Sequence, residues 1–476
     1  MAIVLPKDPP QSSFAPLPQG PQLQKLLARA AGQGASRVSS RLSNSRATGI
    51  TAATVEGKTA FGALTWAREV VADCLRERPA SLGVVALGLE DDARSATLQR
   101  LVAAAAAAAF KLPSFKTDEH PRPIDLESLT LLDVKPRVDL ESVQAAALGN
   151  NIARWFTALP ANVLTAAAYR SAVEQIAKRY ELACKFLGEK DLERLGAGAF
   201  LAVAQGNAQR DAGMLRLSYR PNEQRHPDLT LIGKGVLFDS GGTNLKPFKS
   251  MLDMHTDMQG SAVALGTLVA LAELEVPYAI DAWLALTENR LSASAYKPQD
   301  VVHAANGTSI HVIHTDAEGR MVLADALALA AREEPKLMID YATMTGSCIS
   351  ALTQRYSGVF SNREPANRLM LDAGAASGER VWPFPMDEDF DQLLRSDIAD
   401  IKQCAVEGDG DHILGARFLS RFVPRSIPWI HLDLSAGEHK SGLAHVPTDI
   451  TGFGVRLTLE LLRSGTPAEI AEKLSA

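Results

Sequence analysis

The second half of the chain alternates apolar, strand-like runs with helical segments, and this alternation limits its fold more than any other feature. Residues 228–236 (DLTLIGKGV) predict a buried strand, and residues 260–274 predict a helix with small residues on one face. The pattern continues with strands at 279–286, 309–313 and 336–342 and an apolar helix at 321–332. It favours a mostly parallel central sheet flanked by helices. Sites in such sheets form beyond the carboxyl ends of strands.

The first part of the chain predicts a separate, smaller α/β domain. A length of 476 residues is too great for one ordinary core. A strand-like run at 81–89 alternates with helical stretches at 60–77 and 92–110. A long helix over 140–159 ends at Pro160 and is expected to connect an N-terminal domain, residues 1–145, to a larger domain, residues 146–476. Residues 1–45 are rich in Pro, Gln and Ser and are expected to be partly extended surface chain.

Composition excludes several classes of protein. The formal net charge is −6, and no stripe of lysine or arginine favours nucleic-acid binding. The four cysteines (Cys74, Cys184, Cys348 and Cys404) include no CxxC pair, so buried reduced thiols are expected rather than a thiolate zinc site. The start of the chain lacks a secretory pattern, and the alanine-rich run at 101–110 is too short to span a bilayer. We expect a soluble, cytoplasmic protein without a membrane partner.

Acidic residues gather where the predicted strands end. Asp239 follows the first strand within FDSGG, and Asp316 and Glu318 follow the strand at 309–313 within TDAEGR. Asp257 precedes the glycine-bearing helix within HTDMQG. Carboxylates that are close together in a partly desolvated cleft repel one another unless cations lie between them, and such sites suit Mg²⁺, Mn²⁺ or Zn²⁺. Each Asp taken singly could instead be a helix cap or turn residue, and Gly241, Gly242 and Gly319 could be turn formers only.

Four motifs together resemble the leucyl aminopeptidase family, the cytosolic M17 metallopeptidases. They are GKGVLFDSGGTNLKP (233–247), MHTDMQGSAVALG (254–266), TDAEGRMVLADAL (315–327) and DYATMTGS (340–347). The resemblance extends back to ALPANVLTAAAY (158–169) and forward to TGFGVR (451–456), which is about the C-terminal two-thirds of the chain. The first 140 residues contain no matching motif. The resemblance implies a hydrolase that removes the N-terminal residue of peptides.

The resemblance also implies the ligands of two divalent metal ions, Mn²⁺ or Zn²⁺, with Mg²⁺ or Co²⁺ as alternatives. The tighter site falls on Lys234, Asp239, Asp257 and Glu318, and the more exchangeable site on Asp239, Asp316 and Glu318. Lys234 must lose its proton to ligate a metal. The alternative for Lys234 is a plain salt bridge to Asp239.

Two further residues match the family's catalytic positions. Lys246 matches the lysine that polarises the scissile carbonyl, and Arg320 matches the arginine that holds a bicarbonate general base. The first side chain of the substrate maps to Met254, Thr343 and Gly346, which favours Leu- or Met-sized residues. These three residues could equally have structural roles only.

The chain departs from the usual family pattern at a few positions. The family commonly has Lys, Gly and Asn where this chain has His255, Gln259 and His314, and the stretch at 437–448 is atypical. Because the carboxylate set is already complete, we expect His314 to hydrogen-bond to a ligand rather than to bind metal. These departures leave substrate and metal preference open.

Other functions of such a chain remain to be weighed. A narrower dipeptidase with the same chemistry would differ in its turnover of longer peptides. Some family members also bind DNA, a role against which the acidic composition argues. By analogy with the family alone, we expect a homohexamer.

Overall fold

The computed structural model describes residues 1–118, 124–134, 138–222 and 224–475, which divide into two compact units. One unit contains residues 1–147, 375–378 and 440–449, and the other contains residues 148–374, 379–439 and 450–476. The division falls inside helix α4 (Glu141–Thr157), where the sequence predicts a connecting helix. In the described residues, no helix combines the length and the apolar character that crossing a membrane requires.

The N-terminal unit is a five-stranded sheet with helices. Its strands are β1 (Ala2–Leu5), β2 (Arg37–Arg41), β3 (Gly49–Thr54), β4 (Ser81–Ala86) and β5 (Ser128–Leu132), in the order β2-β3-β1-β4-β5. Only β2 pairs antiparallel, with β3. The helices are η1 (Gln11–Phe14), α1 (Gly20–Ala31), α2 (Ala60–Leu75) and α3 (Asp91–Ala109). The predicted strand at 81–89 and both predicted helices are present.

Residues 1–45 are more ordered than the sequence suggests. The expectation of extended surface chain is wrong for Ala2–Leu5, because this short run is the fully buried central strand β1. It is also wrong for α1, which is amphipathic and buries Leu23 and Leu27. The many Pro, Gln and Ser residues occupy the turns and exposed faces between these elements and hide a strand of only four residues.

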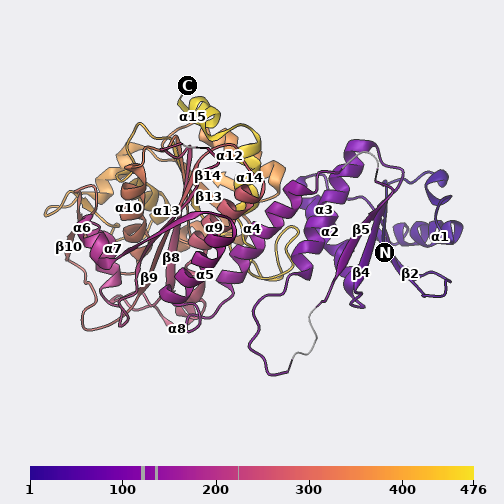
Figure 1. The fold of residues 1–476 in the computed structure, drawn as a ribbon, viewed down its shortest axis with the longest axis horizontal. Helices are drawn as coiled ribbons and strands as arrows, with labels where there is room; N and C mark the ends of the chain where they lie inside the picture. The colour runs from indigo at the N-terminus through magenta and orange to yellow at the C-terminus, as the bar shows by residue number, and fades with distance from the viewer. Residues whose placement is uncertain (119–123, 135–137, 223, 476) are drawn as a thin grey trace. The chain divides into compact units, whose positions relative to one another are not determined.

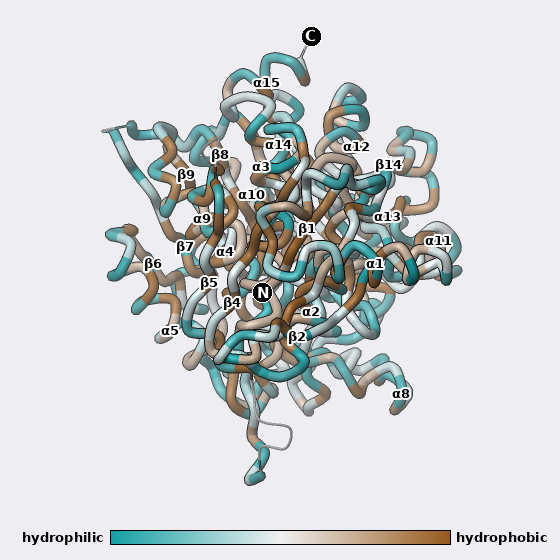
Figure 2. Tube along the Cα trace, turned by 90° about the vertical axis from the view of Figure 1, so that its right-hand side faces the viewer, coloured by the Kyte–Doolittle hydropathy of each residue, from teal (hydrophilic) through white to brown (hydrophobic). Residues whose placement is uncertain are grey.

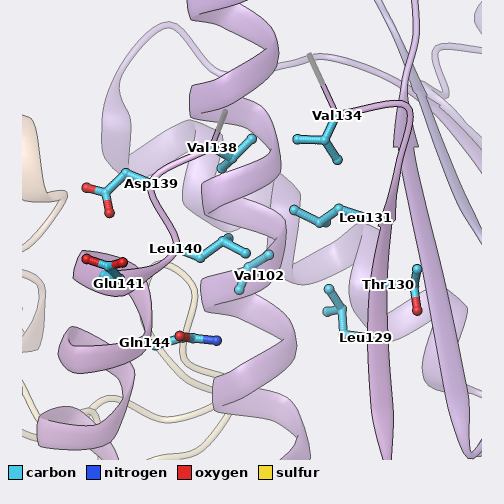
Figure 3. A pocket seen from close by; sticks show the side chains of 10 residues that line it. All are labelled: Val102, Leu129, Thr130, Leu131, Val134, Val138, Asp139, Leu140, Glu141 and Gln144. Atoms are coloured by element: carbon cyan, nitrogen blue, oxygen red, sulfur yellow. The ribbon is translucent and has the colours of Figure 1, made fainter. Parts of the chain in front are cut away.

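A hollow of about 1200 Å³ lies beside the edge strand β5 of this unit. Val102 of α3, Leu131 of β5 and Leu140 point toward one another across it, whereas Asp139 and Glu141 point away (Figure 3). The lining thus combines apolar and polar residues, and it holds no cluster of metal ligands among the described residues.

The larger unit is built on an eight-stranded sheet with the order β14-β13-β16-β12-β8-β9-β7-β6. Its centre is parallel: β16 (Trp429–Asp433), β12 (Leu337–Ala342), β8 (Leu229–Asp239) and β9 (Ile280–Asn289) run in one direction. Towards the edges, β7 (Gly213–Tyr219), β6 (Ala183–Gly188) and β13 (Ser357–Ser361) pair antiparallel, and β14 (Val381–Pro383) is parallel to β13. The sheet is mixed, with a parallel core as expected.

Helices cover both faces of this sheet (Figure 1). α9 (Gln259–Glu273) packs on one face, and α10 (Glu318–Ala331) packs on the other with α7 (Gly198–Ala204) and α13 (Asp411–Ser420). α9 is buried along almost its whole length, which explains its small residues, and α10 is buried throughout. The hydrophobic character of α10 and of the central strands is visible in Figure 2.

The remaining elements of the larger unit lie around this core. The helices are α5 (Ala166–Arg179), α6 (Glu189–Arg194), α8 (Phe248–Met251), η2 (Met254–Thr256), α11 (Gly346–Leu352), η3 (Thr353–Arg355), α12 (Ala366–Ser377), η4 (Glu388–Leu394), α14 (Val455–Arg463) and α15 (Pro467–Ser475). A separate three-stranded sheet contains β10 (Val301–His303), β11 (Ser309–His311) and β15 (Ile401–Lys402).

Two expectations need correction here. The strand predicted at 309–313 is β11, which belongs to the small sheet and pairs antiparallel with β10, so it is not a strand of the central sheet. Periodicity shows that a segment is extended but not which strand is its neighbour. The expectation of four buried thiols is also wrong, because Cys184 is exposed on the edge strand β6 and Cys74 is half-buried; all four cysteines are free.

Candidate metal centre

Three carboxylates converge beyond the carboxyl end of β8. Oxygen atoms of Asp239, Asp316 and Glu318 all lie within 4.8 Å of one another. Asp239 is the last residue of β8, Glu318 is the first residue of α10, and Asp316 lies in the loop before that helix. A single divalent cation can contact one oxygen from each of them, because carboxylate ligands surround such cations at about 2–2.6 Å.

Lys234 joins a fourth carboxylate to this group. Its buried ammonium Nζ lies 2.8 Å from Asp257 Oδ1 and 2.8 Å from Glu318 Oε1, and it donates to the carbonyl of Thr343 at 2.9 Å. The Thr343 hydroxyl donates to the same Asp257 oxygen at 2.8 Å. The four carboxylates therefore gather as the sequence predicts. The ion pairs of Lys234 are with Asp257 and Glu318, whereas the salt-bridge alternative placed its partner at Asp239.

The charges of the cluster are strongly coupled. Burial and the charge of Glu318 raise the pKa of Asp239, and burial raises the pKa of Asp257 well above its usual range. Burial together with the charges of Asp239 and Glu318 raises the pKa of Asp316 to about 7. Burial alone would lower the pKa of Lys234, but the surrounding carboxylates raise it above its ordinary value. The arrangement thus has more buried negative charge than its lysines neutralise, and further positive charge would stabilise it.

The residues fit a divalent metal. Asp257 Oδ2 and Glu318 Oε2 are buried and have no hydrogen-bond partner among the described residues. An unsatisfied buried carboxylate oxygen is costly unless a hydrogen bond or a cation compensates it. Oxygen-rich donor sets with little sulfur or imidazole suit Mg²⁺ and Mn²⁺ and also accommodate Zn²⁺. The donor set at this site therefore supports the metal chemistry expected from the sequence.

Two glycines allow the chain to pass close to the cluster. Gly241 follows Asp239 with a φ of 88°, a conformation that favours glycine, and its amide donates to Asp239 Oδ1 at 2.8 Å. Gly319 lies against Lys234, where an added Cβ would be 2.6 Å from Nζ. Both glycines therefore have a packing or conformational requirement beyond the formation of a turn.

Some residues that organise the site were missed by the sequence analysis. Asn289 at the end of β9 donates to Asp239 Oδ1 at 2.8 Å and to the Thr315 carbonyl at 3.0 Å. The rule that sites lie beyond strand ends could have found it. Gln403 accepts from the amides of Ile313 and His314 and donates to the Ala317 carbonyl. No local pattern signals Gln403, because it lies far along the chain from the loop that it holds.

The two predicted catalytic residues lie in the same region. Lys246 Nζ lies 2.8 Å from Asp239 Oδ2 and 2.6 Å from Asp316 Oδ1, and its side chain is 14% exposed. The Arg320 guanidinium is buried, two residues after Glu318 on α10. Its Nη1 donates to the Gln403 carbonyl at 3.2 Å, and its Nη2 donates to Asp411 Oδ2 at 2.7 Å. Lys246 can therefore meet a substrate at the edge of the cluster, whereas Arg320 is buried and held by Gln403 and Asp411.

Comparison with known proteins decides the family. The catalytic-domain profile of the cytosol aminopeptidase family, Peptidase_M17, matches residues 151–459. The chain belongs to the cytosol aminopeptidase family. A probable cytosol aminopeptidase of Syntrophotalea carbinolica is 41% identical over 375 residues, which are 77% of this chain and 74% of that protein.

Solved structures resemble nearly the whole chain. A mutant of tomato leucine aminopeptidase is 26% identical with a TM-score of 0.85, covering 98% of this chain and 94% of that one. The bottromycin maturation enzyme BotP in complex with Mn is 27% identical with a TM-score of 0.83, covering 97% and 99%. Membership in this family confirms a metal-dependent hydrolase that removes N-terminal residues from peptides, and confirms the predicted α/β fold.

The three residues predicted to contact the first side chain of the substrate differ in their surroundings. Thr343 is joined to the carboxylate cluster, because its carbonyl accepts from Lys234 and its hydroxyl donates to Asp257. Gly346 begins α11, and the space beside its Cα is open. Met254 is half-buried in η2, just before Asp257. Of the three, only Thr343 is hydrogen-bonded to the candidate ligands in the described structure.

Two departures from the usual family pattern contact each other. Gln259, at the start of α9, donates to Glu438 Oε1 at 3.1 Å and packs so closely on Gly437 that an added Cβ there would be 2.3 Å from Gln259 Oε1. The first residues of the atypical stretch at 437–448 therefore pack against Gln259, the side chain that stands where the family commonly has glycine. His314 Nδ1 accepts a bond from the Asp316 amide at 3.3 Å, which supports the loop and leaves that nitrogen engaged.

Proposed function

We propose that this chain is a two-metal aminopeptidase whose tighter cation is held by Lys234, Asp239, Asp257 and Glu318, and whose more exchangeable cation is held by Asp239, Asp316 and Glu318. The observation that carries this proposal is the convergence of carboxylate oxygens within 4.8 Å. Two buried oxygens of the cluster also have no hydrogen-bond partner among the described residues. Mn²⁺ or Zn²⁺ are the proposed ions, and Mg²⁺ or Co²⁺ also suit the donors.

Each of the residues around the cluster has a separate role in the proposed hydrolysis. When bound, the cations supply Lewis acidity and lower the pKa of the attacking water. Burial alone would lower the pKa of Lys246, but the charges of Asp239, Glu318 and Asp316 raise it above its ordinary value, so the side chain is a cation at neutral pH. It donates to the scissile carbonyl oxygen as negative charge develops there. Arg320 supplies the positive charge that holds the anionic general base, which the resemblance implies to be bicarbonate. Its buried guanidinium supports that role, because a planar fork suits an oxyanion.

Substrate selection follows from the same groups. The free α-amine of the peptide would serve as a further ligand of a bound cation. Only the peptide bond next to that amine then lies at the site, which restricts hydrolysis to the first residue. We propose that Met254, Thr343 and Gly346 contact the first side chain and favour Leu or Met. The open space beside Gly346 and the flexible thioether of Met254 support this assignment.

A metal-reconstitution assay tests this function. Chelated protein should be inactive and should recover activity with Mn²⁺, Zn²⁺, Co²⁺ or Mg²⁺, with the highest turnover on peptides that begin with Leu or Met. An N-acetylated peptide of the same sequence is the matched control, and it should not be cleaved. Full activity after chelation, or equal cleavage of the acetylated peptide, would refute the proposal. Turnover of dipeptides alone would favour the narrower dipeptidase.

The resemblance also supports a homohexamer in the cytoplasm. Relatives that are named cytosol aminopeptidases support the location, which fractionation of a producing cell would test. Light scattering is expected to give six times the chain mass of 50.9 kDa. The mass of a monomer would refute the homohexamer and would leave the proposed metal chemistry unaffected.

A further inference from the structure

Thr315 joins two loops of the candidate site through its buried side chain and its backbone. It directly precedes Asp316 in the loop before α10, and it is fully buried. Its Oγ1 donates to the Gly241 carbonyl at 2.7 Å and accepts from the Asn244 amide at 2.8 Å. The Thr315 amide donates to Asn244 Oδ1 at 2.9 Å. Three hydrogen bonds of one residue therefore connect the loop of Asp316 to the loop that follows Asp239.

The loop that follows Asp239 carries Lys246. Gly241 and Gly242, with φ values of 88° and 67°, allow this loop to turn back on itself. The Lys246 amide donates to the Ser240 carbonyl at 3.0 Å, which closes the turn. The turn brings the Lys246 ammonium to 2.8 Å from Asp239 Oδ2. The conformation of this loop therefore decides where the proposed catalytic ammonium lies.

Thr315 is itself fixed through its carbonyl group. The carbonyl accepts from the Tyr296 hydroxyl at 2.7 Å and from Asn289 Nδ2 at 3.0 Å. A threonine that only formed a turn would hydrogen-bond to backbone groups close to it in sequence. The two backbone partners of the Thr315 hydroxyl instead lie 74 and 71 positions earlier in the chain. Local turn formation therefore does not account for this side chain.

The backbone around Lys246 has little burial to fix it. The neighbouring residues 245 and 247–250 are exposed. Asn244, which lies two residues before Lys246, is joined to Thr315 by hydrogen bonds of both its backbone and its side chain. These bonds therefore restrain the part of the loop that places the lysine.

We propose that Thr315 is a positioning residue, whose hydroxyl sets where the Lys246 ammonium lies relative to Asp316 and to the scissile carbonyl. Lys246 Nζ and Asp316 Oδ1 are 2.6 Å apart, and each belongs to one of the two loops that Thr315 joins. A shift of one loop against the other therefore moves the lysine relative to the proposed metal ligands. This inference rests on the two-metal aminopeptidase proposed above.

The test removes the Thr315 hydroxyl but keeps the shape of the side chain. In the metal-loaded full chain, Thr315→Val should lower kcat on leucine p-nitroanilide by a factor on the order of 10–10², as for a misplaced catalytic group. KM should change little, because Lys246 acts on charge that develops only in the transition state. Metal stoichiometry should equal that of the unmodified protein. Thr315→Ser keeps the hydroxyl and should retain most of the turnover.

Thr230→Val is the matched control for the loss of a buried hydroxyl. Thr230 lies on β8 and is also fully buried, and its hydroxyl has no hydrogen-bond partner among the described residues. The same substitution at this position should leave kcat unchanged. A fall in kcat at Thr315 alone would therefore be due to the contacts of that hydroxyl.

A second background separates positioning from a general structural role. If Thr315 acts through Lys246, then Thr315→Val should cause no further fall in kcat when it is combined with Lys246→Ala. Asn244→Ala, which removes the acceptor of the Thr315 amide, should also lower kcat, and only while Lys246 is present. Asn244 is partly exposed, so this variant decides the question if thermal unfolding shows that Thr315→Val does not fold.

Four results would overturn the inference. They are an undiminished kcat in the folded variants, a Thr315→Ser protein as slow as Thr315→Val, an equal loss with and without Lys246, and a loss of bound metal. The last result would mean that Thr315 supports Asp316 as a ligand and does not place the lysine. In all four cases the unmodified protein cleaves peptides. Failure of the proposed function itself would appear differently, as an unmodified, metal-loaded protein that cleaves none.

Discussion

Glu318→Ala is expected to abolish hydrolysis of leucine p-nitroanilide and to lower the amount of bound metal. The Glu318 carboxylate lies at the centre of the cluster, because one oxygen contacts Lys234 and the other is buried with no partner among the described residues. Its oxygens also lie within reach of those of Asp239 and Asp316. If Glu318 bridges both cations, its removal weakens both sites at once, and Asp239→Ala should have the same effect for the same reason.

Activity and metal content should be measured on the same preparations. Glu193→Ala is a suitable control, because Glu193 is an exposed carboxylate on α6 of the same unit. It should keep full activity and full metal. A Glu318→Ala protein with undiminished metal and turnover would contradict the ligand assignment, and thermal unfolding would show whether the variant is folded.

Lys246→Ala is expected to retain its metal while kcat falls by a factor on the order of 10²–10³, as for the loss of an oxyanion donor. Lys246 touches Asp239 and Asp316 through its ammonium, but it approaches them from the partly exposed side of the cluster. Removing it deletes a positive charge that faces the substrate and leaves every proposed ligand in place.

The specificity of this effect can be checked within the same loop. Lys249 is an exposed lysine three residues further along, in α8, and Lys249→Ala should leave kcat unchanged. If Lys246→Ala turned over at the normal rate, the ammonium would have another role. If it lost its metal instead, Lys246 would serve mainly to orient Asp239.

The parallel core of the larger unit could be predicted from sequence because each of its elements is long and strongly apolar. β8, β9 and β12 are buried along almost their whole length, so their runs contain few polar residues. The antiparallel edge strands β6, β7 and β13 were not predicted. β11 was predicted as a strand but not as part of a separate small sheet, because periodicity does not identify a strand's neighbour. Very short strands such as β10 and β15 have too few residues to show a period. The strand at Ala2–Leu5 was missed for the same reason.

The residues of the candidate site also differ in whether the sequence alone could predict them. The carboxylates and Lys234 follow or belong to predicted strands and helices, so the topology brings them together. Their individual roles rest on the family resemblance. Gln403 and Asp411 could not be found in this way, because they come from segments about 80–90 residues beyond the loop and helix that they hold. Contacts of that kind depend on tertiary packing and leave no local signal.

The contact between Gln259 and the segment that begins at Gly437 has a practical meaning for work with relatives. The amide fills the space that the usual family glycine would leave, and the facing Gly437 has no room for a side chain. Glycine in place of Gln259 would therefore leave a void, and any residue with a side chain in place of Gly437 would clash with Gln259. Homologous segments should be exchanged here as a pair, so that the glutamine and the backbone that accommodates it stay together.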